Sequence, residues 1–271
     1  NITGSCNTAV GQQALNGNTT ASNNTSVGYK SLCANTTGTQ NVALGVAVKA
    51  NTTANNNIGI GYDALCVNQT GNANVAIGTD SLRNNTVGNN TAVGYTALAA
   101  NTTGGFNTSI GSCSLNANQT GASNVALGFR SLKLNTANSN TAIGKDALQS
   151  NTSGTSNVAV GDSALDANTT ASANTAIGAS ALKANTTGGD NTVLGHNAGC
   201  QVTTGGNNTL LGKNAGTSTS PFTVTDATTN HRVVIGNNDV SNAYIRVAWT
   251  VTSDLRDKTN FGTVPHGLDF V

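Results

Sequence analysis

The sequence predicts an all-β protein, a parallel β-solenoid or β-roll built from coils of 16 or 17 residues. First, a unit that begins Asn-Thr-Ala-Val-Gly and continues x-x-Ala-Leu-x-x-Asn-Thr-Thr-Gly recurs thirteen times. Second, the chain has no Glu and no Met, so strong helix formers are scarce. Third, a unit with about three apolar side chains cannot form a core alone, so the units must stack.

The repeat extends from the leading Asn of the first unit, Asn7, through the last unit at Asn208, and fills residues 1–216. Nine of the twelve intervals are 17 residues and three are 16. Five columns of nearly constant residue type run through the units: a leading Asn, a branched apolar residue, Gly, Leu and a second Asn. Three units illustrate the columns: Asn7, Val10, Gly11, Leu15 and Asn18; Asn90, Val93, Gly94, Leu98 and Asn101; Asn174, Ile177, Gly178, Leu182 and Asn185.

Each part of the unit has its own structural expectation. Thr-Ala-Val carries β-branched residues two apart, which suits a short strand, and the Gly allows a bend or a close backbone approach. The x-x-Ala-Leu segment is too short for a stable helix, and we expect a second short strand in preference to an irregular turn. Asn-Thr-Thr-Gly is typical of a turn, and stacked Asn side chains can form a ladder along the axis. The two residues after the Gly vary freely and are expected to face solvent.

A stack of hairpins is the alternative architecture. It requires two-residue loops such as Asn-Gly, and Asn16-Gly17 is the single Asn-Gly in the chain. Parallel coils are therefore favoured. Because the predicted core holds few large side chains, we also expect copies of the chain to cover a second face of each other.

The period ends after Gly216, and we assign residues 217–252 to a spacer followed by a β-rich cap. The strand-then-Gly pattern resumes at 231–238, and 243–251 alternates like a stronger strand that holds Tyr244 and Trp249. A cap of this kind would protect the open end of the stack.

Two resemblances to known families follow from these motifs. Ser-Asp-x-Arg-x-Lys-x-Asn from Ser253, followed by Gly-Leu-Asp-Phe from Gly267, resembles the opening of the endosialidase-type intramolecular chaperone domain of bacteriophage tail fibres and tailspikes. This resemblance makes residues 253–271 the start of a truncated chaperone domain and implies a self-cleavage junction between Thr252 and Ser253. The repeats look like those in the heads of trimeric autotransporter adhesins, which implies a homotrimer.

We therefore expect a structural fibre or adhesion segment of a phage-type tail fibre, located on the virion, which presents a host-receptor-binding surface. Its expected partners are further copies of itself, as a homotrimer, and a host cell-surface receptor or glycan. A cell-surface trimeric adhesin or an extracellular filament subunit is the alternative.

Other function classes have less support. A net charge of +1 argues against nucleic-acid binding, and no apolar run approaches the roughly 20 residues needed to insert into a membrane. A polysaccharide depolymerase would need paired carboxylates. Lys30 and Arg130 occupy, in other units, the site that some of the candidate Asp residues hold, which argues for solvated positions. The candidates are Asp63, Asp80 and Asp146 at that site, and Asp162 and Asp166 on either side of an Ala-Leu pair. Ice binding ranks last, because Thr pairs lie in the turn.

No enzyme activity, cofactor or metal site is expected. The five cysteines and three histidines have irregular spacings. Tyr29, Tyr62 and Tyr95 occupy the same site at intervals of 33 residues, so they would line one face about 10 Å apart. Such aromatics suit either sugar stacking or shielding of the edge of the stack.

Overall fold

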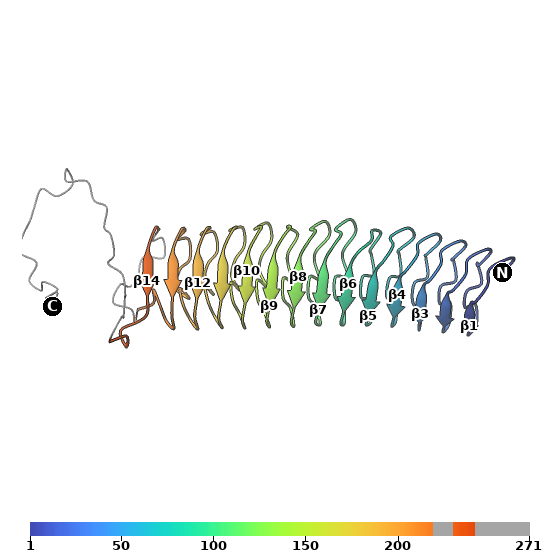
Figure 1. Ribbon diagram of the computed structural model, residues 1–271, viewed down its shortest axis with the longest axis horizontal. Helices are drawn as coiled ribbons and strands as arrows, with labels where there is room; N and C mark the ends of the chain where they lie inside the picture. Colours follow the sequence, from blue (N-terminus) through green and yellow to red (C-terminus); the bar gives the residue numbers. More distant parts are fainter. Residues whose placement is uncertain (219–229, 242–271) are drawn as a thin grey trace, which may run out of the picture. The chain divides into compact units, whose positions relative to one another are not determined.

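The computed structural model describes residues 1–218 and 230–241, and residues Asn1–Asp239 form one compact unit. This unit is a β-solenoid in which fourteen parallel strands lie in chain order in one sheet, as Figure 1 shows. The predicted fold class is confirmed. The strands are β1 Thr8–Val10, β2 Thr25–Val27, β3 Val42–Leu44, β4 Ile58–Ile60, β5 Val75–Ile77, β6 Thr91–Val93, β7 Thr108–Ile110, β8 Val125–Leu127, β9 Thr141–Ile143, β10 Val158–Val160, β11 Thr175–Ile177, β12 Thr192–Leu194, β13 Thr209–Leu211 and β14 Val233–Ile235.

Every strand pairs with its equivalent one coil further along, so the register follows the sequence repeat. Thr91 pairs with Thr108, and Val93 pairs with Ile110. From β2 onward the middle residue of each strand is buried, while the first and third residues point away from the core. The small residue between two branched residues therefore lets the sheet lie close to the rest of the coil.

The Gly that follows each strand is required by its backbone and by its neighbour. In the thirteen repeats its φ lies between +98° and +141°, a region that disfavours residues with a Cβ. At Gly144 an added Cβ would lie 2.6 Å from the carbonyl carbon of Gly161 in the next coil. The predicted close backbone approach is confirmed, and the glycines line up along one axis.

The expected second strand is wrong, because the x-x-Ala-Leu segment forms turns. Its Leu is left-handed, as at Leu98 with φ 53°, and so is the residue two positions earlier, Thr96 with φ 51°. A left-handed residue with a side chain costs about 1–2 kcal/mol. The turn is held by bonds between coils, since the backbone N–H of Leu98 donates to the carbonyl of Ser114 at 3.0 Å. The left-handed turn also directs each Leu side chain into the core. The alternation of inward and outward residues in a strand would not predict that direction.

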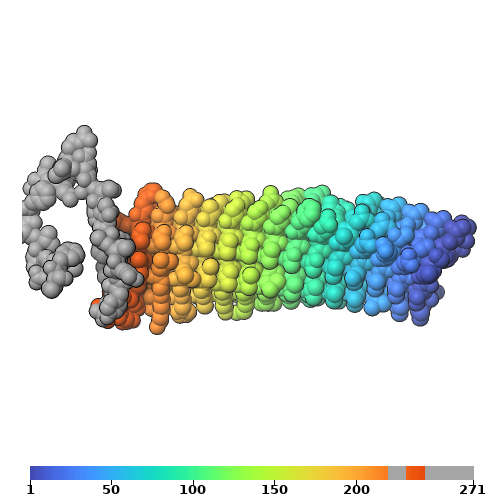
Figure 2. Space-filling view, in the orientation of Figure 1, coloured from blue at the N-terminus to red at the C-terminus, as the bar shows by residue number. Residues whose placement is uncertain are grey.

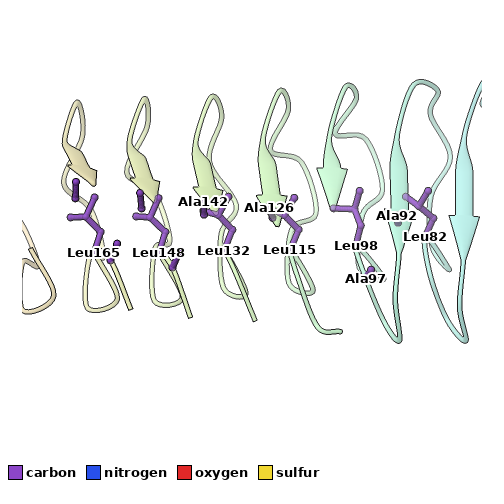
Figure 3. Packing of buried hydrophobic residues seen from close by; sticks show 14 of the residues in the cluster. Leu82, Ala92, Ala97, Leu98, Leu115, Ala126, Leu132, Ala142, Leu148 and Leu165 are labelled. Atoms are coloured by element: carbon purple, nitrogen blue, oxygen red, sulfur yellow. The ribbon is translucent and has the colours of Figure 1, made fainter. Parts of the chain in front are cut away.

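The core is a narrow column, mainly of Leu and Ala side chains, that runs the length of the stack. Figure 3 shows the part of this column between Leu82 and Leu165. Leu98 and Leu115 are fully buried, as are Ala97 and Ala126 beside them. No coil contributes enough apolar area to fold alone. Stability therefore arises from contacts between neighbouring coils.

Core side chains vary in size in a compensating way. The Leu column holds Gly at Gly199, where an added Cβ would lie 2.7 Å from Cδ1 of Leu210. Leu210 occupies the middle of β13, a position that is usually Ala, and it is fully buried. The shortened third coil differs, because Val48 in the Leu column and Gly59 in the middle of β4 are both smaller than usual and pack closely enough that an added Cβ at Gly59 would clash with Cγ2 of Val48.

Both Asn columns form the predicted ladders. In the leading column, Nδ2 of Asn124 donates to Oδ1 of Asn107 at 3.1 Å, and the backbone N–H of Asn140 donates to Oδ1 of Asn124 at 3.0 Å. In the second column, Nδ2 of Asn118 donates to Oδ1 of Asn101 at 3.2 Å. These Asn side chains are buried, so they satisfy turn backbone groups that water cannot reach.

The strand expected at 231–238 is confirmed as β14, which pairs with β13 through Thr209 and Val233. The strand expected at 243–251, with Tyr244 and Trp249, lies outside the described residues. So does the chaperone-like segment 253–271.

Candidate functional site

The outer face of the sheet carries an unbroken apolar stripe. The stripe is the third residue of each strand, and each member is a branched apolar side chain that is half-exposed or exposed. Exposure reaches 51% at Leu194 and 59% at Ile235. The members are Val10, Val27, Leu44, Ile60, Ile77, Val93, Ile110, Leu127, Ile143, Val160, Ile177, Leu194, Leu211 and Ile235.

The first residue of each strand lies on the same outer face and is Thr, Val or Ile in all fourteen strands. The outward positions from β1 to β14 therefore hold no charged residue. We call the outward residues of the fourteen strands the sheet face. Each coil forms one band along the unit, so a column of equivalent residues makes a continuous surface feature, as Figure 2 illustrates.

The residues after the repeat Gly form a second surface, here called the turn face: the first and second residues after each of these glycines. It carries an exposed aromatic column of Tyr29, Tyr62, Tyr95 and Phe129, with exposures of 49%, 59%, 56% and 45%. Sequence reasoning identified the three tyrosines and missed Phe129. The signal was present, because Phe129 lies two repeats after Tyr95 at the same site.

The expectation that both residues after the Gly face solvent is correct for the first and wrong for several of the second. Asp63 and Asp146 are buried. Nζ of Lys49 lies 2.6 Å from Asp63, and Nε of Arg130 lies 2.7 Å from Asp146. Both ion pairs join neighbouring coils, which lays the carboxylates against the stack and away from water.

The carboxylates that a depolymerase would need are mostly engaged in ion pairs. Asp80 lies 3.7 Å from Nε of Arg83, in addition to the pairs of Asp63 and Asp146. Burial raises the pKa of Asp146, but hydrogen bonds from Arg130 and the charges of Arg130 and Lys145 together lower it below its ordinary value.

The remaining two candidates are separate from these pairs. Asp162 is exposed and accepts a hydrogen bond from the Ser163 hydroxyl at 2.8 Å. The pKa of Asp166 is raised by burial and by the negative charge of Asp146. The geometry of the five carboxylates thus favours a structural role for Asp63, Asp80 and Asp146.

Among residues 1–218 and 230–241, no group of three or more His, Cys, Asp or Glu side chains could hold a metal ion. Within the same ranges, no helix has the length and apolar character needed to cross a bilayer. All five cysteines are free thiols.

The sequence also contains Asn-x-Thr motifs that could in principle accept a glycan. Asn18, Asn101 and Asn185 of these motifs are buried ladder residues, so their amides are inaccessible in the folded chain. The expected cleavage junction, Thr252–Ser253, lies outside the described residues. Comparison with known proteins adds no relative: no family model matches the chain, and neither does a curated protein or a solved structure.

Proposed function

We propose that this chain is a shaft segment of a homotrimeric fibre of the phage tail-fibre type, which presents a receptor-binding surface to a host cell envelope. The uncharged sheet face carries the proposal. An apolar surface that extends along fourteen strands is unusual on a monomer, which supports the proposal that other copies of the chain cover it. Three sheet faces packed around a common axis would remove the stripe from water and leave the charged turn faces outside.

The energy available from such packing is substantial. Fully burying a Val, Leu or Ile side chain stabilises by about 1.5–3 kcal/mol, so covering the half-exposed stripe residues contributes roughly 1 kcal/mol each. Summed over the stripe, which has one residue in each of the fourteen strands, the gain is roughly 14 kcal/mol. Assembly and folding are therefore expected to be coupled.

Light scattering after size exclusion tests the proposal. Three chains of 27.0 kDa give a species of about 81 kDa, and we expect that mass for the unaltered chain. Ile143→Lys places a charge in the stripe and should yield monomers or unfolded chains. Thr79→Lys, at an exposed site on the turn face, is the matched control and should remain trimeric. A folded 27.0 kDa monomer of the unaltered chain would overturn the proposal.

One observation favours a second candidate function, ice binding. Eight of the fourteen strands begin with an outward Thr, for example Thr91 and Thr108, beside the branched stripe. A regular array of hydroxyl and methyl groups on a parallel sheet can order water. Thermal hysteresis by a monomeric chain would favour this function, whereas a trimer that covers the sheet face would exclude it.

A further inference from the structure

The aromatic column of the turn face has a regular spacing that self-packing does not explain. Tyr29, Tyr62, Tyr95 and Phe129 recur at every second coil, and the coil between two of them carries a smaller residue, such as Thr79 or Ser112. Coils lie about 4.8 Å apart, so neighbouring rings are separated by about 10 Å. Aromatic rings on adjacent coils would lie within stacking distance of one another, whereas rings two coils apart are too far apart to stack and stay exposed.

The rings at the two ends of the column are held in place by their neighbours. Nζ of Lys30 lies 5.3 Å from the centroid of the Tyr29 ring. The guanidinium of Arg130 lies 4.8 Å from that of Phe129 and donates two hydrogen bonds to Asp146, at 2.7 and 2.8 Å. The hydrogen bonds to the next coil restrain Arg130, and its contact with Phe129 should in turn restrain the ring, which would lower the entropic cost of binding.

The charge of the turn face predicts that it stays accessible in an assembly that buries the sheet face. Charged side chains flank the aromatic column, including Lys30 and the exposed Lys145. Charges lose solvation when buried, so this side of each coil is expected to remain in water when three chains associate.

We propose that the aromatic column binds an extended β-1,4-linked glycan along the axis of the solenoid. In such a glycan each sugar is rotated by half a turn relative to the last, so every second pyranose presents the same apolar face. Two sugars span close to the distance between successive rings of the column. Each ring would stack on one pyranose of alternate sugars, and the intervening small residues leave room for the sugars between them. This inference rests on the proposed function, for which it names the ligand class.

Isothermal titration of the full chain with defined oligosaccharides tests the inference. The probes are the β-1,4-linked hexasaccharides of glucose and of N-acetylglucosamine, the corresponding disaccharides, and an α-1,4-linked glucose hexasaccharide. A hexasaccharide reaches three rings and a disaccharide one, so we expect binding of at least one β-1,4 hexasaccharide at least tenfold tighter than that of its disaccharide. The helical α-1,4 hexasaccharide should bind no better than a disaccharide.

Two variants assign the binding to the column. Tyr62→Ala combined with Tyr95→Ala removes the two central rings and should weaken hexasaccharide binding at least tenfold. Phe106→Ala removes an aromatic side chain that is 68% exposed but lies outside the column, and should leave the affinity unchanged. Both variants should keep the solution mass and circular dichroism of the unaltered chain.

The outcomes separate this inference from the proposed function. A trimer that binds neither β-1,4 hexasaccharide, or binds the α-1,4 probe equally well, overturns the glycan inference and leaves the fibre proposal standing. A monomer that binds a β-1,4 hexasaccharide through the tyrosines overturns the fibre proposal and supports the glycan inference. Equal losses of affinity in the Phe106 variant and the double tyrosine variant would also refute the assignment.

Discussion

The exchange of core volume between Gly199 and Leu210 yields a quantitative prediction. In several 17-residue units a Leu in the turn is followed eleven residues later by an Ala in the middle of the strand, as Leu165 is by Ala176. Gly199→Leu together with Leu210→Ala would restore this ordinary pair. The double variant should therefore be close in stability to the unaltered chain, although each single variant is destabilised.

The magnitudes follow from the local geometry. Leu210 is fully buried, so Leu210→Ala alone should cost about 2–5 kcal/mol. At Gly199 the new Cβ would lie 2.7 Å from Leu210 and 3.2 Å from Leu182. Overpacking costs about 1–3 kcal/mol and a left-handed Leu about 1–2 kcal/mol more, since Gly199 has φ 59°. In the double variant only the backbone cost should remain, about 1–2 kcal/mol.

Urea unfolding followed by circular dichroism, at one protein concentration, measures the four free energies of unfolding. We expect a coupling energy of at least about 2 kcal/mol in favour of the double variant. Gly199→Leu combined with the distant Leu65→Ala is the control pair, whose effects should add. If the changes in free energy of unfolding caused by Gly199→Leu and Leu210→Ala also add, the two side chains do not share one space and the account of the core is incorrect.

Three further outcomes test other parts of the stack. Gly144→Ala should destabilise the chain by several kcal/mol, because a Cβ at φ 133° would meet the next coil; unchanged urea unfolding would contradict this. Asn124→Ala should lower the free energy of unfolding by about 2–5 kcal/mol, because it leaves the buried N–H of Asn140 and the part-buried carbonyl of Ala137 without this partner. Asn84→Ala, at an exposed site, should change it by less than about 0.5 kcal/mol. Asp146 has a lowered pKa, so the stability it contributes is present above about pH 4 and lost as the pH falls through its folded pKa. Asp146→Asn should accordingly reduce the difference in stability between pH 7 and pH 3, and an undiminished difference would count against the ion pair with Arg130.

The period of the sequence by itself determined the architecture. Residues at the same position of successive units lie directly above one another, so constant columns such as Asn7, Asn90 and Asn174 predict ladders without knowledge of the coil shape. The recurring Gly predicted the close backbone approach for the same reason. These features depend on contacts between identical neighbours, which the repeat itself defines.

Only the tertiary structure decided the path of the chain within a coil. The sign of φ at Leu98 is not encoded in its hydrophobicity, because hydrogen bonds to the next coil stabilise a left-handed turn that propensity alone disfavours. Similarly, the position of Asp146 after the Gly suggested solvent, whereas the ion pair with Arg130 of the preceding coil places it against the stack. Stacking is a property of the repeat, but the direction of each side chain depends on backbone dihedrals and partners in adjacent coils.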